Sequence, residues 1–196
     1  MDEQLTAYLD ELYSRGRAHD AERTDRLERL RNVEPDTAQL LSVLVRALRP
    51  QRLLELGTSN GYSTIWLADA ARSVGGRVVS VDLDPVRTAQ ARKHLAQVHL
   101  ERYVELRTED AALTLSSSPA SSWEMIFLDA ERSVYASYWP NLIRILAPGG
   151  LLVVDNVLSH AAEVRELREL VAVESTVTEA LAPTGAGALL VVRDSA

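Results

Sequence analysis

The sequence predicts an α/β protein: a Rossmann-like, doubly wound, mostly parallel sheet of seven strands with a C-terminal antiparallel hairpin, preceded by N-terminal helices. From residue 52 onward, short apolar runs alternate with helix-like stretches, which is typical of a parallel sheet covered by helices on both faces. The runs are continuously apolar, as expected for strands buried on both sides. A short spacer separates the last two runs and cannot hold a crossover helix, so these strands should be antiparallel neighbours.

The N-terminal quarter is predicted to be helical. Apolar residues recur at helical spacing over residues 2–15, which predicts an amphipathic helix. Residues 22–31 alternate charge signs and are interpreted as a solvated helix face, with a basic strip facing the substrate as the alternative. Pro35 is suited to open a further helix that runs to Arg49.

Five apolar runs predict the parallel strands, at residues 52–57, 77–84, 103–108, 124–130 and 150–156. The stretches between and after them predict helices at 61–73, 85–98, 109–116, 131–147 and 159–171. The hairpin strands are expected at 172–181 and 187–193.

Length and composition indicate one globular domain over residues 1–196, with residues 1–49 as helices that cover the site and 50–196 as the core. The formal net charge of -7 disfavours a general binder of nucleic-acid backbones, although a local basic patch stays open. The absence of cysteine excludes disulfides and zinc sites built on thiolates. The N-terminus does not resemble a secretory signal, and no apolar run approaches a membrane span, so we expect a cytoplasmic protein.

A glycine turn follows the first predicted strand. It reads GTSNG at residues 57–61, and a helix is expected next. Ligands of open α/β sheets bind beyond the carboxyl ends of the strands, and glycine lets the backbone approach them closely. Near this turn, Glu55 could face the ammonium group of an amino-acid ligand, and Asp82 could accept hydrogen bonds from two ribose hydroxyls.

Two alternatives remain for the turn. One is a tight connection without a ligand. The other is a nicotinamide-cofactor site of a dehydrogenase, whose fingerprint is G-x-G-x-x-G. This chain has G-x-x-x-G instead, with Ser59 at the middle glycine position.

Oxygen-bearing side chains end two further strands. Asp129 follows the fourth strand, and Asp155 and Asn156 follow the fifth. Because adjacent strand ends lie close together, these three oxygen ligands should converge on the same sheet edge as the glycine turn. Such a set suits a hard divalent ion such as Mg²⁺. The alternative is that the two aspartates only cap the helices that follow.

With these motifs in place, LLELGTSNGYS at residues 53–63 resembles the turn of class I S-adenosylmethionine-dependent methyltransferases. The likeness is to the catechol and caffeoyl-CoA O-methyltransferase family and its small bacterial members, and it runs from about Val33 to Arg193. It implies a single methyltransferase domain that methylates a hydroxyl of a small catechol-like or polyhydroxylated substrate. It also implies S-adenosyl-L-methionine and a divalent cation, Mg²⁺ by expectation, as cofactors, and a homodimer.

The resemblance implies specific cofactor contacts. The methionine moiety would be surrounded by Glu55, Gly57, Ser59, Gly61 and Ser63, and the ribose would be held by Asp82. The adenine would be bordered by Leu83, Asp110 and Ala111, with Glu109 at a position where the family usually has a small residue. Val33 matches the segment that closes over the cofactor carboxylate, and Asp129 also borders the cofactor.

For catalysis, the resemblance implies that Asp129, Asp155 and Asn156 hold the metal and that two adjacent substrate oxygens bind it. Family members usually carry a lysine three residues after the first aspartate, and this chain has Arg132 there. Arginine keeps its proton, so it cannot be a general base. We expect Asp129 and Arg132 to be catalytic, with Arg132 orienting the substrate or stabilising its oxyanion, and Tyr135 to face the substrate.

Two other functions stay open. One is an O-methyltransferase for hydroxyuridine in tRNA, because small bacterial members of the family include that activity. The other is a non-catalytic nucleotide-binding module, although such a module needs no metal triad.

Overall fold

The computed structural model describes residues 1–195. Its strands are β1 (Arg52–Leu56), β2 (Arg77–Asp82), β3 (Val104–Thr108), β4 (Trp123–Leu128), β5 (Leu146–Val154), β6 (Val177–Ala182) and β7 (Ala188–Arg193). Its α-helices are α1 (Glu3–Ala21), α2 (Pro35–Leu48), α3 (Tyr62–Val74), α4 (Pro85–Gln97), α5 (Ala111–Ser117), α6 (Tyr135–Ile145) and α7 (Arg165–Val173). The described residues also contain three short 3₁₀ helices: η1 (Arg26–Glu28), η2 (Glu101–Tyr103) and η3 (Arg132–Val134).

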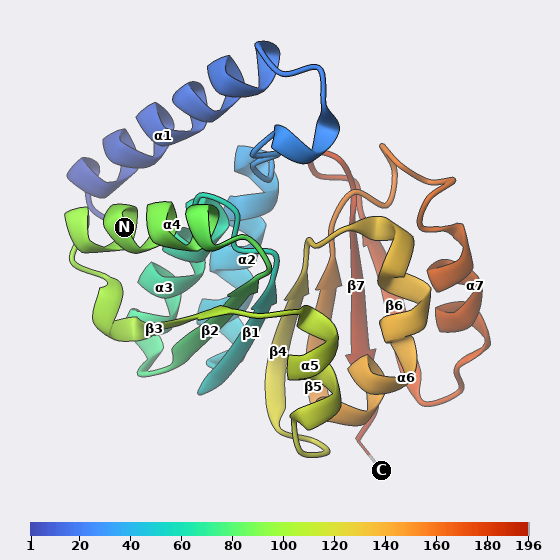
Figure 1. Ribbon diagram of the computed structural model, residues 1–196. Coiled ribbons are helices and arrows are strands. Elements are labelled where there is room, and N and C mark those ends of the chain that lie inside the picture. Colours follow the sequence, from blue (N-terminus) through green and yellow to red (C-terminus); the bar gives the residue numbers. More distant parts are fainter. Residues whose placement is uncertain (196) are drawn as a thin grey trace.

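The strands form one sheet in the order β3-β2-β1-β4-β5-β7-β6 (Figure 1). The first five strands pair in parallel, and β7 pairs antiparallel with both β5 and β6. This topology confirms the predicted fold class, including the C-terminal hairpin.

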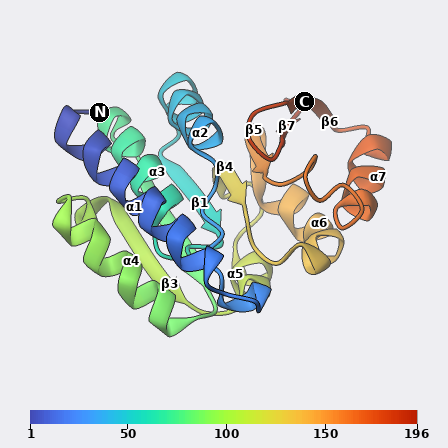
Figure 2. The same ribbon diagram turned by 90° about the horizontal axis from the view of Figure 1, so that it is seen from above.

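The sheet is packed on both faces. Successive residues of β1 point to opposite sides, so Leu53 belongs to one buried cluster and Leu54 to the other. Helices α1 to α4 contribute to the first cluster and α5 to α7 to the second. Figure 2 shows these two groups of helices on either side of the sheet, with α1 passing over its edge.

The predicted solvated helix at residues 22–31 is wrong. Apart from the turn η1, this segment is irregular, and α1 runs on to Ala21 instead of stopping near residue 15. Polar contacts replace the helical ladder, because the Asp20 carboxylate accepts hydrogen bonds from the Leu30 and Arg31 amides at 2.7 and 2.8 Å. We call residues 22–33 the strap, since they lie above the sheet beyond the carboxyl ends of its parallel strands (Figure 1).

Several boundaries in the C-terminal half also differ from the prediction. The expected helix 131–147 is divided into η3 and α6, and β5 begins at Leu146 rather than at residue 150. Residues 157–164 form turns tied to the loop before β7, where the Val157 amide donates to the Gly187 carbonyl at 3.0 Å, so α7 starts only at Arg165. This helix extends to Val173, and β6 therefore starts at Val177.

Within residues 1–195, no helix combines the length and the apolar character that crossing a membrane requires.

Candidate active site

The turn between β1 and α3 brings the ends of two strands together. Gly57 and Gly61 have φ angles of 110° and 88°, which favour glycine, and Ser59 takes the left-handed region at 47°. A Cβ on Gly57 would lie 2.2 Å from the Asp129 carbonyl oxygen. The absence of a side chain at Gly57 thus lets the end of β1 lie directly against the end of β4.

A cavity of about 1180 Å³ opens over this turn. Twelve of the predicted site residues line it: Val33, Gly57, Ser59, Ser63, Asp82, Leu83, Asp110, Ala111, Asp129, Arg132, Asp155 and Asn156. The cofactor residues and the metal residues that the sequence predicts therefore share one cavity.

Asp82 is fixed at the wall of the cavity by two backbone amides. Ser59 N donates to its Oδ2 at 2.7 Å, and Asp84 N donates to its Oδ1 at 2.9 Å. A carboxylate oxygen has more than one lone pair, so both oxygens can still accept a hydroxyl group. Asp110 lies at the N-terminus of α5, where it accepts a hydrogen bond from Ala112 N at 2.8 Å.

The strap closes the cavity from above. The Ser59 hydroxyl donates to the Leu30 carbonyl at 2.7 Å, and Arg87 of α4 donates to the Arg29 carbonyl at 2.9 Å. Val33, at the end of the strap, is buried and lines the cavity.

Three predicted site residues do not line the cavity. Glu55 is fully buried beneath it, and its carboxyl group accepts hydrogen bonds from the hydroxyls of Ser63 at 2.6 Å and of Ser80 at 2.5 Å, and from Thr64. Burial raises the pKa of Glu55 to about 7, against the lowering effect of these hydroxyls. Among the predicted methionine contacts, Ser59 and Ser63 rather than Glu55 are therefore the polar side chains at the wall.

Gly61 and Tyr135 support the site from outside the cavity. A Cβ on Gly61 would lie 2.9 Å from the Ala91 Cβ, so this glycine allows α4 to pack closely. Tyr135 is fully buried, and its hydroxyl donates to the Ala130 carbonyl at 3.1 Å.

Asp129 and Asp155 lie side by side because they follow paired residues, Leu128 and Val154, at the ends of β4 and β5. The Asn156 amide nitrogen donates to Asp129 Oδ1 at 3.2 Å and to Asp155 Oδ2 at 2.8 Å. Burial and the Asp155 carboxylate raise the pKa of Asp129 well above its ordinary value. Burial also raises the pKa of Asp155 to about 6.

These residues fit a divalent cation. Asp155 Oδ1 is buried without a hydrogen-bond partner among the described residues, which is costly unless a further group meets it. The oxygen and the nitrogen of a side-chain amide are assigned from their contacts, and rotation of the Asn156 amide would present its oxygen instead. Across residues 1–195, no three His, Cys, Asp or Glu side chains gather as a metal site, and the group beside the two carboxylates is the Asn156 amide.

Arg132 lies in η3 beside the acid pair. Only 4% of the residue is exposed, yet it lines the cavity. Its Nε donates to Glu163 Oε2 at 3.0 Å.

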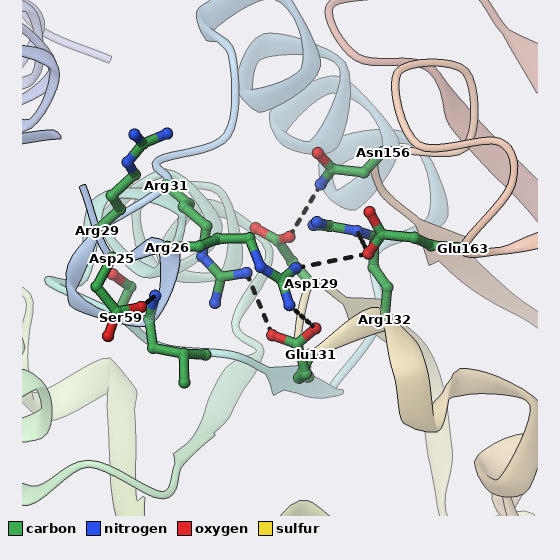
Figure 3. A network of polar contacts seen from close by, with 12 residues as sticks. Asp25, Arg26, Arg29, Arg31, Ser59, Asp129, Glu131, Arg132, Asn156 and Glu163 are labelled. Atoms are coloured by element: carbon green, nitrogen blue, oxygen red, sulfur yellow. Dashed lines mark hydrogen bonds and ion pairs between the residues drawn. The ribbon is translucent and has the colours of Figure 1, made fainter. Parts of the chain in front are cut away.

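A network of ion pairs links Arg132 to the strap, and it was not predicted from the sequence. Figure 3 shows Glu131 beside arginines of the strap, and Glu163 beside Arg26 of the strap and Arg132. Arg26 Nη2 donates to Glu131 Oε1 at 2.8 Å, and Arg31 Nη1 lies 3.5 Å from Glu131 Oε2. The alternating charges of residues 22–31 were the available signal, but the carboxylates that Arg26 and Arg31 contact are 100 or more residues away in the chain.

The sequence model of the O-methyltransferase family matches residues 4–184. A catechol O-methyltransferase from Niastella koreensis is 35% identical over 130 residues, which cover 65% of this chain and 58% of that protein. A catechol O-methyltransferase from Mycobacterium tuberculosis is 33% identical over 126 residues, which cover 64% of this chain and 57% of that protein. The matched part thus spans little more than half of the length of these curated relatives.

Solved structures share the whole fold. An O-methyltransferase from Bacillus cereus in complex with SAH has a TM-score of 0.79 and 26% identity, covering 96% of this chain and 91% of that chain. An O-methyltransferase from Streptomyces achromogenes involved in tomaymycin synthesis, in complex with SAM, has a TM-score of 0.78 and 26% identity, covering 100% of this chain and 91% of that chain.

Proposed function

The chain belongs to this O-methyltransferase family, and on that premise we propose that it transfers the methyl group of S-adenosylmethionine to a hydroxyl oxygen of a small catechol-like or polyhydroxylated substrate. One observation carries the proposal. The wall that suits a nucleoside, at Asp82, and the acid pair Asp129 and Asp155 belong to the same cavity. A methyl donor and a hydroxyl acceptor held there would be neighbours.

Support for the methyl donor comes from the shape and polarity of one side of the cavity. Asp82 offers two fixed acceptors for ribose hydroxyls, and Leu83 and Ala111 lie beside it for an adenine. The two relatives described above were solved with SAH and SAM in place. The donor would supply an electrophilic methyl carbon, so the chain has mainly to orient the reactants.

Support for a divalent cation comes from the unpartnered Asp155 Oδ1 and the adjacent Asp129 carboxylate. A cation held by these groups and by Asn156 would lower the pKa of the acceptor hydroxyl. Magnesium fits the oxygen ligands best.

Arg132 supplies positive charge beside the acceptor in this proposal. Its guanidinium stays protonated, so it orients the substrate and stabilises a developing oxyanion but does not remove the proton. Because Arg132 is almost completely buried, little water screens its positive charge.

A tRNA substrate would need free cationic groups around the cavity to hold phosphates. Four of the six arginines that line the cavity are instead paired with carboxylates: Arg26 and Arg31 contact Glu131, Arg87 contacts Asp84, and Arg132 contacts Glu163. This pairing favours a small molecule, and tRNA is retained as one arm of the test.

The test is a methyl-transfer screen with labelled S-adenosylmethionine over catechols, flavonoids, caffeoyl esters and hydroxylated tRNA, with Mg²⁺ or with a chelator. We expect transfer to at least one vicinal diol and loss of that transfer in the chelator. Transfer to tRNA alone would replace the proposed substrate class. Binding of S-adenosylhomocysteine without transfer to any acceptor would indicate a non-catalytic binding module.

A further inference from the structure

The Arg132 guanidinium is buried but only partly satisfied. Its Nε contacts Glu163, and within residues 1–195 this is its one hydrogen-bonding partner. The terminal nitrogens Nη1 and Nη2 are therefore left to the cavity that Arg132 lines with Asp129 and Asp155. Donors that open onto the cavity are available to a ligand group.

Glu163 binds two arginines from different parts of the chain. Besides Arg132 it contacts Arg26 of the strap, whose Nη1 lies 3.5 Å from Glu163 Oε2. Glu163 Oε2 thus contacts Arg132 of the site and Arg26 of the strap. In Figure 3 this carboxylate lies between Arg26 and Arg132, with Asp129 close by.

Without Glu163, Arg132 would still share the cavity with the carboxylates of the acid pair. Among the described residues no salt bridge joins Arg132 to Asp129 or Asp155, although all three line one cavity. A guanidinium released from Glu163 could turn onto these carboxylates, where it would compete with a divalent cation and withdraw its donors from the substrate.

We propose that Glu163 is a positioning residue for the methyl transfer. It holds Arg132 by its Nε, so that the terminal nitrogens of Arg132 face the acceptor. Through Arg26, it also couples this orientation to closure of the strap. The inference rests on the proposed function for its catalytic part. Its structural part, the Glu163–Arg132 contact and its link to the strap, can be measured on the protein without any acceptor.

Glu163→Gln is the first variant, and Glu166→Gln on the exposed side of α7 is its matched control. The Glu163 side chain is 42% exposed, so its ion pairs contribute little to stability and the melting temperature should stay unchanged. We expect kcat on the best acceptor to fall about tenfold in Glu163→Gln, because a small misplacement of an orienting group lowers the rate strongly. The affinity for S-adenosylhomocysteine should change much less, and Glu166→Gln should behave as the wild type.

Two further readouts separate positioning from a structural role. In ¹⁵N-arginine spectra, the Arg132 Nε–H signal should exchange slowly with water in the wild type and quickly in Glu163→Gln. Dissociation of S-adenosylhomocysteine should be faster in Arg26→Gln and in Glu163→Gln, and the double variant should show less than the combined effect, since both substitutions break the Arg26–Glu163 contact.

A wild-type kcat together with an unchanged Nε–H signal in Glu163→Gln would overturn the proposal. Additive effects of the two substitutions on cofactor dissociation would overturn the link to the strap. If the wild-type protein methylates no acceptor, the proposed function fails, while the Nε–H signal and the dissociation rates still decide whether Glu163 holds Arg132 and the strap.

Discussion

At the scale of single residues, Glu55 is a buried carboxyl group whose partners are hydroxyls. Burial raises its pKa from an ordinary 4.5 to about 7. The folded protein therefore binds more protons than the unfolded chain between these values, so the free energy of unfolding falls as pH rises from 4.5 to 7. Below pH 4.5 the Glu55 carboxyl group is protonated in both the folded and the unfolded state, so it no longer lowers the free energy of unfolding.

Glu55→Gln removes this titration and keeps the shape of the side chain. We expect the variant to gain stability relative to the wild type as pH rises, by on the order of 3 kcal/mol between pH 5 and pH 8. Urea unfolding of both proteins at several pH values measures the difference. Titration of Asp155 is common to both proteins and cancels, so a difference that does not change with pH would contradict the buried, proton-binding Glu55.

The position of acidic residues at the strand ends could be predicted from the sequence, but the residues that contact nearby side chains could be predicted only in part. Asp82, Asp129 and Asp155 each follow an apolar run, so the sequence alone places them at one sheet edge. The sequence could not show that Glu55 turns away from the cavity, because strand periodicity does not tell which buried face holds hydroxyl groups. Ser63, Thr64 and Ser80 satisfy this carboxyl group from two other elements.

At the scale of elements, the turn after β1 depends on Gly57. Alanine there would be strained at a φ of 110° and would bring its Cβ within 2.2 Å of the Asp129 carbonyl oxygen. We expect Gly57→Ala to lose several kcal/mol of stability, of which about 1 kcal/mol or more comes from the backbone strain. Cofactor affinity should fall as β1 and β4 are pushed apart.

Gly75→Ala is the control for the strain. Gly75 has a φ of 80°, and the nearest heavy atom to its added Cβ is Gln51 Oε1 at 4.0 Å. This variant should show a smaller loss of stability and normal titration with S-adenosylhomocysteine. Equal losses in the two variants would mean that the contact with Asp129 is unimportant.

Whether an element could be predicted depends on where its hydrogen bonds go. The strands were found from their apolar runs, because burial on both faces of the sheet requires a continuous apolar run wherever the paired strand lies in the chain. The strap was mistaken for a helix because its amides bond to side chains such as Asp20 and its arginines contact Glu131 and Glu163, far along the chain. Alternating charges are compatible with both arrangements, and only the distant partners distinguish them.

At the scale of the whole molecule, the parallel sheet determines where the chemistry lies. The ends of β1, β2, β4 and β5 open onto one cavity, so donor, cation and acceptor would meet without any movement of the core. Parallel pairing of the strands follows from the alternation of strands and helices, and this made the shared edge predictable. Homodimerisation and a cytoplasmic location remain predictions, since they depend on surfaces and on a cellular context beyond the chain.

The most direct measurement is paramagnetic relaxation of the methyl carbon of ¹³C-labelled S-adenosylmethionine by Mn²⁺ bound to the protein. If the donor and the cation share the cavity lined by Asp82, Asp129 and Asp155, Mn²⁺ will broaden the methyl signal strongly, and Asp155→Asn will abolish the effect. A sharp methyl signal from bound donor in the presence of bound Mn²⁺ would place the two groups far apart and contradict the proposed site.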